Sequence, residues 1–256
     1  MPVTASDPDV GTLLRLWRRR RRFSQQELSD LSTVSTRHLS RVETGRAHPT
    51  SEMVLHLADH LDVPLADRNR LLLAAGFAPR FAEHALDDAG VAVVMDGLRA
   101  LLDAHLPYPA LLLDDHWDIV DRNAAVDVLI AGCAARLLEP PVNVLQLCLH
   151  PDGLAPRIGD LEQWGAHLLR RLRSRAEHTH DARHEALAVE MSGYLDGLGE
   201  PPAAGPVLTL EIDVDGTPAR FFSVSARLDT ATDTTLEGLH LETFLPADET
   251  TRGILT

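Results

Sequence analysis

Residues 24–46 constrain the fold of this chain more than any other stretch, because they encode two short helices joined by a tight turn. Ser24 and Glu27 have the spacing of a capping box, in which each side chain accepts a hydrogen bond from the other residue's backbone amide. Ser35 is placed to cap the second helix. Only residues 33–34 remain for the turn, and so short a connection is typical of a helix-turn-helix pair.

Apolar residues at helical spacing extend this pair into five helical segments within residues 11–76. Leu28 and Leu31 are expected to form the buried face of the first helix of the pair. Ser51 is expected to cap the fourth helix, and the fifth runs from about Ala66 to Ala75. Helices this short bury too little surface alone, so we expect them to pack as one all-α bundle.

Charge is distributed very unevenly along the chain. The 256 residues carry a formal net charge of −14, which is unusual for a protein that binds an acidic polymer. Residues 1–80 nevertheless hold 12 arginines against 9 acidic residues, whereas residues 81–256 hold 12 arginines against 29. Five consecutive arginines, Arg18 to Arg22, directly precede the helix pair. This asymmetry predicts a nucleic-acid-binding module joined to an acidic partner domain.

In a helix-turn-helix pair the second helix lies in the major groove of DNA, so its exposed side chains reach base edges. An arginine can bind guanine through two hydrogen bonds, which makes Arg37 or Arg41 the best candidate for specificity. Arg46 follows the end of that helix and is expected to touch phosphate. The residues expected to contact bases are Ser35, Thr36, Arg37, Ser40 and Arg41.

Residues 11–65 resemble the xenobiotic-response-element type of repressor domain, the family of the phage lambda repressor and Cro. The resemblance is carried by Ser24-Gln-x-Glu-Leu-Ser, Val34-Ser35-x-x-x-Leu39-Ser40-x-x-Glu43-x-Gly45-Arg46 and Pro49. It implies a lambda-repressor-like five-helix domain that places Gln25 and Gln26 on phosphate. It also implies an internal pair between Glu43 and one arginine of the run Arg18 to Arg22.

The second half of the chain predicts an α+β domain with an antiparallel sheet. Residues 110–113 and 117–120 read as a hairpin, and helical stripes follow. Three further strands are expected at Val207 to Val214, Ala219 to Arg227 and Leu239 to Leu245. In the second of these, alternation places Phe222 and Val224 on the inward face.

This order resembles the PAS-type sensor fold and, more specifically, MmyB-like regulators, which join a repressor-type domain to a PAS-like ligand-binding domain. The resemblance is carried by residues 109–123, Asn143-Val-Leu-Gln-Leu, His150-Pro-Asp-Gly-Leu154, residues 164–175 and residues 239–248. It implies a mostly apolar pocket, for which fatty-acid-like ligands have been proposed in the family. The candidate lining residues are Leu111, Trp117, Leu145, Trp164, Leu210, Phe222 and Leu241, for each of which ordinary core packing is the competing role. Asn123, His150 and Arg170 could orient a polar head group, and their competing roles are a helix cap, a turn residue and a solvated arginine.

We therefore expect a helix-turn-helix DNA-binding domain at residues 1–80, a helical connector at 81–106 and a PAS-like regulatory domain at 107–256. The expected partners are a double-stranded DNA operator, a second copy of the chain and a small hydrophobic ligand. No cofactor is expected apart from a bound fatty acid or another hydrophobic small molecule. The absence of a long apolar stretch and of an export signal predicts a cytoplasmic protein without a membrane partner.

Two other classes of function remain open from the sequence. The acidic domain could instead bind a protein, as an antitoxin or a polymerase-contacting activator does. A metal-dependent enzyme is the third possibility, because His180 and His184 are four residues apart, the spacing of two zinc ligands on a helix, although the stretch is polar on all sides, as a solvated segment between helices would be. The metalloprotease pattern is not complete there, since Ala188 occupies the place of the next histidine. We therefore expect no metal site and no enzymatic activity.

Overall fold

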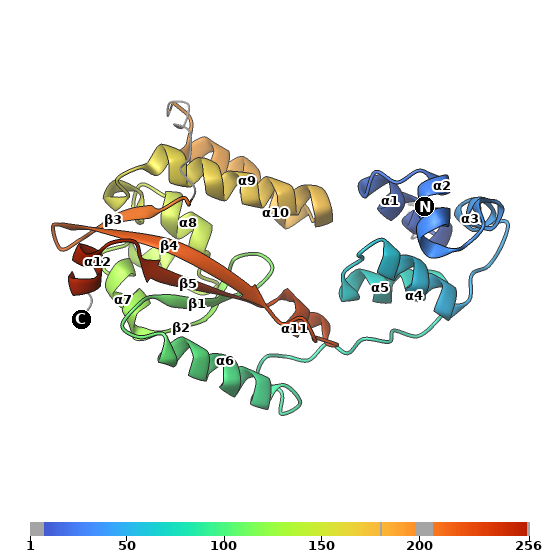
Figure 1. Ribbon diagram of the computed structural model, residues 1–256, viewed down its shortest axis with the longest axis horizontal. Coiled ribbons are helices and arrows are strands. Elements are labelled where there is room, and N and C mark those ends of the chain that lie inside the picture. Colours follow the sequence, from blue (N-terminus) through green and yellow to red (C-terminus); the bar gives the residue numbers. More distant parts are fainter. Residues whose placement is uncertain (1–7, 180, 198–206, 255–256) are drawn as a thin grey trace, which may run out of the picture. The chain divides into compact units, whose positions relative to one another are not determined.

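The computed structural model describes residues 8–179, 181–197 and 207–254, which form two compact units (Figure 1). The N-terminal unit consists of Met1–Ala85 together with Asp229–Glu237, and the C-terminal unit consists of Leu86–Leu228 together with Gly238–Thr256. The segment Asp229–Glu237 is therefore far in sequence from the rest of the N-terminal unit. None of the described helices is long and apolar enough to span a bilayer.

The N-terminal unit contains the five short helices expected from the sequence, and its all-α class is confirmed. The capping box between Ser24 and Glu27 is present, and the Ser35 side chain accepts from the amide of His38. Thr50, rather than Ser51, caps the fourth helix, because its hydroxyl accepts from the amide of Met53 at 3.2 Å. The helices are α1 (Val10–Arg20), α2 (Gln25–Ser32), α3 (Thr36–Glu43), α4 (Ser51–His60) and α5 (Leu65–Ala74).

The core of this bundle joins all five helices. Leu28 is buried as predicted, but Leu31 is 51% exposed, because the short α2 turns only one narrow stripe inward. Gly11 lets α1 approach α3 closely, since a Cβ atom at this position would lie 2.2 Å from the carbonyl oxygen of Val42. The other members of the core include Leu14, Trp17, Leu39, Val42, Val54, Leu57, Leu61, Leu71 and Leu72.

The C-terminal unit is built on one five-stranded antiparallel sheet with the strand order β2-β1-β5-β4-β3, which confirms the α+β class. The chain therefore inserts its last strand, β5, between the first hairpin and the second. The strands are β1 (Ala110–Leu113), β2 (Ile119–Arg122), β3 (Leu210–Val214), β4 (Thr217–Arg227) and β5 (His240–Pro246).

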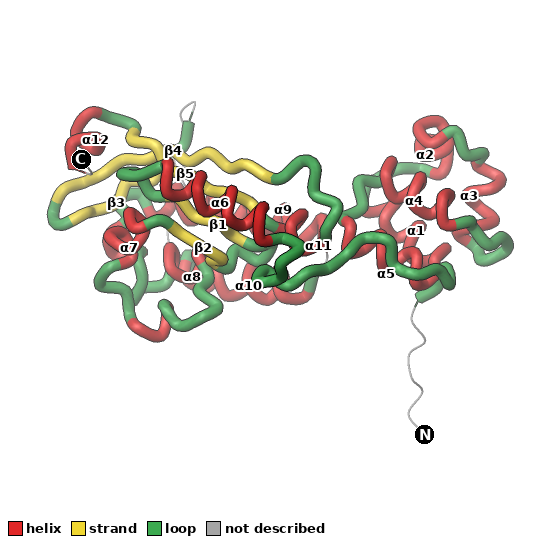
Figure 2. Tube along the Cα trace, turned by 90° about the horizontal axis from the view of Figure 1, so that it is seen from below, coloured by secondary structure: helices red, strands yellow, loops and turns green. Residues whose placement is uncertain are grey.

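Helices cover the sheet, with α6 on one face and α8, α9 and α10 on the other (Figures 1 and 2). The main core lies between the sheet and the second group, where Phe221, Leu113 and Leu172 are almost completely buried. The helices of this unit are α6 (Ala92–Ala104), α7 (Ala124–Ile130), α8 (Val144–Leu149), α9 (Leu161–Thr179), α10 (Ala182–Tyr194) and α12 (Glu249–Ile254), with two 3₁₀ turns at Ala135–Leu137 and Ala155–Arg157.

The predicted orientation of two strands is wrong by one residue. In β4 it is Phe221 that is fully buried, whereas Phe222 is half-buried and Val224 is exposed. In β5 the inward residues are Glu242 and its neighbours two positions away, not Leu241. Both faces of the sheet carry apolar side chains, so alternation alone could not identify the inner one.

The connection between β4 and β5, residues 229–237, belongs to the N-terminal unit. The amide of Thr234 donates to the carbonyl oxygen of Ala82 at 2.9 Å, and His84 Nδ1 lies 2.7 Å from the Asp233 carboxylate. This connection also begins α11 (Thr234–Gly238).

The same connection caps a helix of the bundle. Pro64 precedes α5 and provides no side-chain cap, but the Glu237 carboxylate accepts a hydrogen bond from the amide of Leu65 at 2.8 Å. A carboxylate at this end is favourable because it satisfies an otherwise unpaired amide and faces the positive end of the helix dipole. A segment next to β5 therefore completes the structure of the helical bundle.

Candidate functional site

Helix α3 presents the basic face that the sequence assigned to DNA. Arg37 and Arg41 are both exposed, and their four-residue spacing places them on the same side of the helix. Ser35 and Arg46 are exposed at its two ends, and Thr36 and Ser40 are half-buried beside the arginines. The predicted base-contacting residues thus form one continuous surface.

A buried ion pair fixes α3 against α1. Arg18 donates from Nε to Glu43 Oε1 at 2.6 Å and from Nη2 to Glu43 Oε2 at 2.8 Å, and Glu43 is only 5% exposed. A third Arg18 bond, at 2.7 Å, reaches the carbonyl oxygen of Phe23. Burial raises the pKa of Glu43, but hydrogen bonds from Arg18 and Gln25 outweigh it and hold this pKa below its ordinary value. The pair matches the arginine–glutamate contact that the repressor resemblance implied, and it identifies Arg18 as the partner.

The two glutamines at the start of α2 are held by neighbouring carboxylates. Gln25 Nε2 donates to Glu43 Oε2 at 2.8 Å, and Gln26 Nε2 donates to Asp30 Oδ1 at the same distance. Gln25 is therefore linked through Glu43 to the recognition helix. A phosphate contact would use the donors that remain on each amide group.

The arginine run divides between internal and exposed roles. Arg20 lies over the ring of Trp17, with 4.8 Å from its guanidinium carbon to the ring centroid. Arg21 donates to the carbonyl oxygens of Leu61, at 2.7 Å, and Asp62. Arg19 and Arg22 are exposed, which leaves these two members of the run on the surface.

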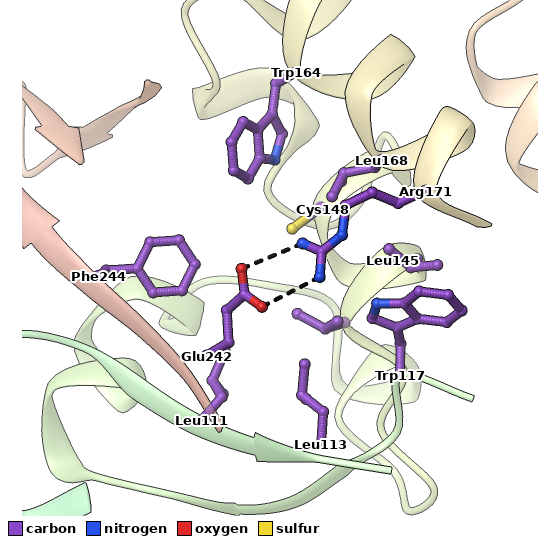
Figure 3. A pocket seen from close by; sticks show the side chains of 11 residues that line it. Leu111, Leu113, Trp117, Leu145, Cys148, Trp164, Leu168, Arg171, Glu242 and Phe244 are labelled. Atoms are coloured by element: carbon purple, nitrogen blue, oxygen red, sulfur yellow. Dashed lines mark hydrogen bonds and ion pairs between the residues drawn. The ribbon is translucent and has the colours of Figure 1, made fainter. Parts of the chain in front are cut away.

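The C-terminal unit contains an apolar pocket between the inner face of the sheet and helices α8 and α9 (Figure 3). Its volume is about 30 Å³, whereas ligand pockets typically measure roughly 300–1,000 Å³. A ligand larger than a few water molecules would therefore have to spread the side chains apart. The pocket is lined by Leu111, Leu113, Trp117, Val144, Leu145, Cys148, Trp164, Leu168, Arg171, Glu242 and Phe244.

The polar part of the pocket is a buried ion pair. Arg171 of α9 reaches Glu242 of β5 through two hydrogen bonds, of 3.3 and 3.4 Å (Figure 3). Glu242 is 6% exposed. Burial raises the pKa of the Cys148 thiol to about 12, so this side chain is uncharged at neutral pH. The pocket therefore holds one positive and one negative charge within an apolar lining.

Four of the eight residues predicted for this site line the pocket: Leu111, Trp117, Leu145 and Trp164. Leu210 is buried in the core on β3, away from the pocket. Phe222 and Leu241 are half-buried on the opposite face of the sheet, because the inward-facing residues of both strands are shifted by one position from the predicted ones.

Asn123 does not line the pocket; it is a buried residue whose side chain forms hydrogen bonds to the backbone. Its Oδ1 accepts from the amide of Ala110 at 3.2 Å, and its Nδ2 donates to the carbonyl oxygens of Leu102 and Tyr108 at 3.0 and 2.8 Å. It precedes α7 but makes no side-chain cap there. With these bonds it joins α6 to the start of β1.

The sequence prediction missed both charged residues of the pocket. Arg171 lies seven residues after Trp164 on α9, which is two helical turns, so both side chains lie on the same face of the helix. Helical periodicity could therefore have placed Arg171 in the pocket. Glu242 alternates with Phe244 on β5, but a charged residue inside a sheet is rarely expected. The other lining residues that were missed are Leu113, Val144, Cys148, Leu168 and Phe244.

One cluster among the described residues could hold a metal ion by composition: His116, Asp181 and His184. Both ring nitrogens of His184 already have partners, the Thr179 hydroxyl and the carbonyl oxygen of Asp115, each at 2.9 Å. The rings of His116 and His184 are also stacked rather than convergent. These contacts explain the cluster as a structural link between the β1–β2 turn and α10. His180 lies outside the described residues.

Comparison with known families gives two matches. Residues 94–256 match the family described as the MmyB-like transcription regulator ligand binding domain. Residues 9–71 match a family described as a helix-turn-helix domain. Neither description is that of an enzyme. No curated protein matches the chain.

Proposed function

The chain belongs to the MmyB-like transcription regulators, and on this basis we propose that a small ligand in the C-terminal unit controls sequence-specific DNA binding by the N-terminal unit. The observation that carries the proposal is the apolar pocket, with its buried ion pair, inside the matched ligand-binding domain. The unit that includes residues 1–80 acts as the DNA-binding domain, and residues 81–106 lead into the regulatory domain.

DNA recognition uses the exposed face of α3. Ser35, Thr36, Arg37, Ser40 and Arg41 read base edges in the major groove. Gln25, Gln26 and Arg46 contact phosphate and set the register of the protein on the duplex. Arg19 and Arg22 add phosphate contacts, because they are the exposed members of the arginine run.

A dimer on a pseudo-palindromic operator is part of the proposal. A single helix-turn-helix unit contacts only a few base pairs, so tight binding requires two half-sites about one helical turn apart. Binding by a dimer also makes the affinity for DNA sensitive to the distance between its two DNA-binding units. A ligand can alter that spacing only if it binds the two geometries with different affinity.

The ligand of the proposal is small and hydrophobic, and a fatty-acid-like molecule is the example that the family suggests. Because the cavity is small, such a molecule must displace the side chains around it, among them Trp117 and Trp164. One wall of the cavity belongs to β5, which directly follows the connection that caps α5. A shift of β5 on ligand entry would therefore pull on a segment of the N-terminal unit.

The function is tested with the full chain. DNA sequences are selected from a random pool, and the affinity for the selected site is then measured before and after solvent extraction of any molecule that the protein retains. Mass spectrometry identifies that molecule. We expect a pseudo-palindromic site and an affinity that changes when the extracted molecule is restored. Equal affinity for DNA in both states would exclude control by a ligand. Co-purification of a protein in place of a small molecule would favour control by a protein partner instead.

Asp233→Ala should loosen the β4–β5 connection from the N-terminal unit. Burial raises the pKa of Asp233, but hydrogen bonds from His84 and from backbone amides outweigh it and keep this pKa below its ordinary value. Its stabilising contribution is therefore present above the ordinary pKa of aspartate and is lost as the pH falls through the lowered value. We expect a loss of about 1–3 kcal/mol at neutral pH, the usual cost of removing a charged hydrogen-bond partner.

Hydrogen exchange at the amides of Leu65 and His84 measures this effect. Exchange should be faster in Asp233→Ala at pH 7, and the difference from the native chain should shrink in acid below the pKa of Asp233. Asp229→Ala is the matched control, since Asp229 is an exposed acid of the same connection. Unchanged exchange at both amides in Asp233→Ala would mean that this carboxylate does not hold the connection.

A further inference from the structure

We propose that the pocket selects a ligand whose polar end is uncharged, and that Glu242 is the residue that determines this preference. The inference rests on the proposed function, because it concerns the chemistry of the same ligand site. It departs from the simplest reading of a fatty-acid-like ligand, in which the arginine of the pocket would bind an ionised carboxylate.

Arg171 is the only cation among the lining residues, and Glu242 neutralises it. The two histidines that face this pair, His167 from α9 and His240 from β5, add no charge at neutral pH. Burial lowers the pKa of His240 to about 4 and also lowers that of His167, so both rings are neutral. Arg175 and Arg227 share the single carboxylate of Asp115, so this cluster carries a net positive charge, but none of its three residues lines the pocket.

An ionised carboxylate entering this pocket would place a second negative charge beside Glu242, with one guanidinium to serve both. Two carboxylates that share a site cannot both ionise without a large cost, and the apolar lining removes the water that would screen them. The ion pair therefore acts as an internal substitute for an anionic ligand. A carboxylate can enter only in its protonated form.

An uncharged polar group meets complementary partners instead. Trp164 is 5% exposed, and its indole N–H has no hydrogen-bond acceptor among the described residues apart from the nearby Cys148 sulfur, a weak one. The indole nitrogen is turned toward Arg171 and Cys148 in Figure 3. A ligand carbonyl oxygen can accept from this N–H, while a ligand N–H or O–H can donate to a free lone pair of Glu242.

Three probes of equal chain length test the preference: octanamide, octan-1-ol and octanoate. Their affinities for the full-length protein are measured by titration calorimetry at pH 7.5, where octanoate is ionised. We expect octanamide to bind at least about tenfold more tightly than octanoate, because a site that hydrogen-bonds one polar group discriminates against a mismatched one. Affinity for octanoic acid should increase as the pH is lowered toward the pKa of the probe.

Glu242→Gln is the decisive variant, because the amide keeps the shape of the side chain but leaves Arg171 with an unbalanced charge. It should reduce the ratio of octanamide to octanoate affinity at least about tenfold, through tighter binding of octanoate. Glu211→Gln is the matched control, since Glu211 pairs with Arg220 on the same sheet but outside the pocket. Trp164→Phe should weaken octanamide more than octan-1-ol, because the amide carbonyl is the stronger acceptor for the indole N–H, whereas the alcohol can bind by donating to Glu242 alone.

The outcomes separate this inference from the proposed function. If the native protein binds octanoate as tightly as octanamide at pH 7.5, the preference for an uncharged end is wrong, although the pocket is still a ligand site. If none of the three probes binds, the ligand pocket of the proposed function fails and the inference fails with it. The comparison of probes on the native chain is sufficient even if Glu242→Gln does not fold.

Discussion

Replacing Glu43 with alanine should lower the free energy of unfolding of the N-terminal unit by about 3–5 kcal/mol, the usual cost of leaving one member of a buried ion pair without its partner. The substitution strands the Arg18 guanidinium in the interior and removes the acceptor of the Gln25 side chain. Because this pair is the main polar link between α1 and α3, the loss should appear first as mobility of the recognition helix.

The measurement combines thermal unfolding with hydrogen exchange at the amides of α1 and α3. Glu52→Ala is the control, since Glu52 is an exposed glutamate at the start of α4 and its removal should change the free energy of unfolding far less. The pKa of Glu43 is held below its ordinary value, so the contribution of the pair should also disappear as the pH falls through that lowered pKa. A loss below about 1 kcal/mol in Glu43→Ala would contradict the assignment.

Arg37→Ala should weaken binding to the selected DNA site by about 1–3 kcal/mol and relax the preference at one base pair. The exposed guanidinium lies on the first turn of α3, where side chains of a recognition helix reach base edges. The measurement is the affinity for the selected site and for its variants at each position, at several salt concentrations.

Arg46→Ala is the natural comparison, because Arg46 is expected to contact phosphate. It should weaken binding to all sequences about equally and reduce the salt dependence by roughly one ion. If Arg37→Ala behaves in this way instead, Arg37 is a backbone contact, and Arg41 becomes the candidate for reading the base.

The helical bundle could be predicted well because its signals are local. The capping box of Ser24 and Glu27 and the cap at Ser35 involve residues three positions apart, and the structure contains both. The resemblance to a repressor domain added the pair of Glu43 with an arginine of the run. Where the prediction failed, as at Leu31, the error was in how many residues of one helix face are buried.

The ligand pocket was only half predictable because its chemistry depends on distant residues. Glu242 is stable inside the sheet because Arg171 reaches it from a helix 71 residues earlier in the chain. Neither residue signals this partnership locally, and apolar side chains on both faces of β4 and β5 hid the orientation of the strands. The partners of the β4–β5 connection are farther apart still, since His84 and Asp233 are separated by 149 positions and Leu65 and Glu237 by 172.

That connection also has a genetic consequence. The chain passes between the two units three times, after Ala85, after Leu228 and after Glu237, so the DNA-binding unit is not encoded by one contiguous stretch of the gene. A truncated protein that ends at residue 85 would lack the carboxylate that caps α5. A recombination event that exchanged the regulatory half for that of a relative would keep a complete DNA-binding unit only if the incoming segment carried equivalents of Asp233 and Glu237. Selection on the DNA-binding half therefore extends to the codons of residues 229–237, which lie far from those of the helices.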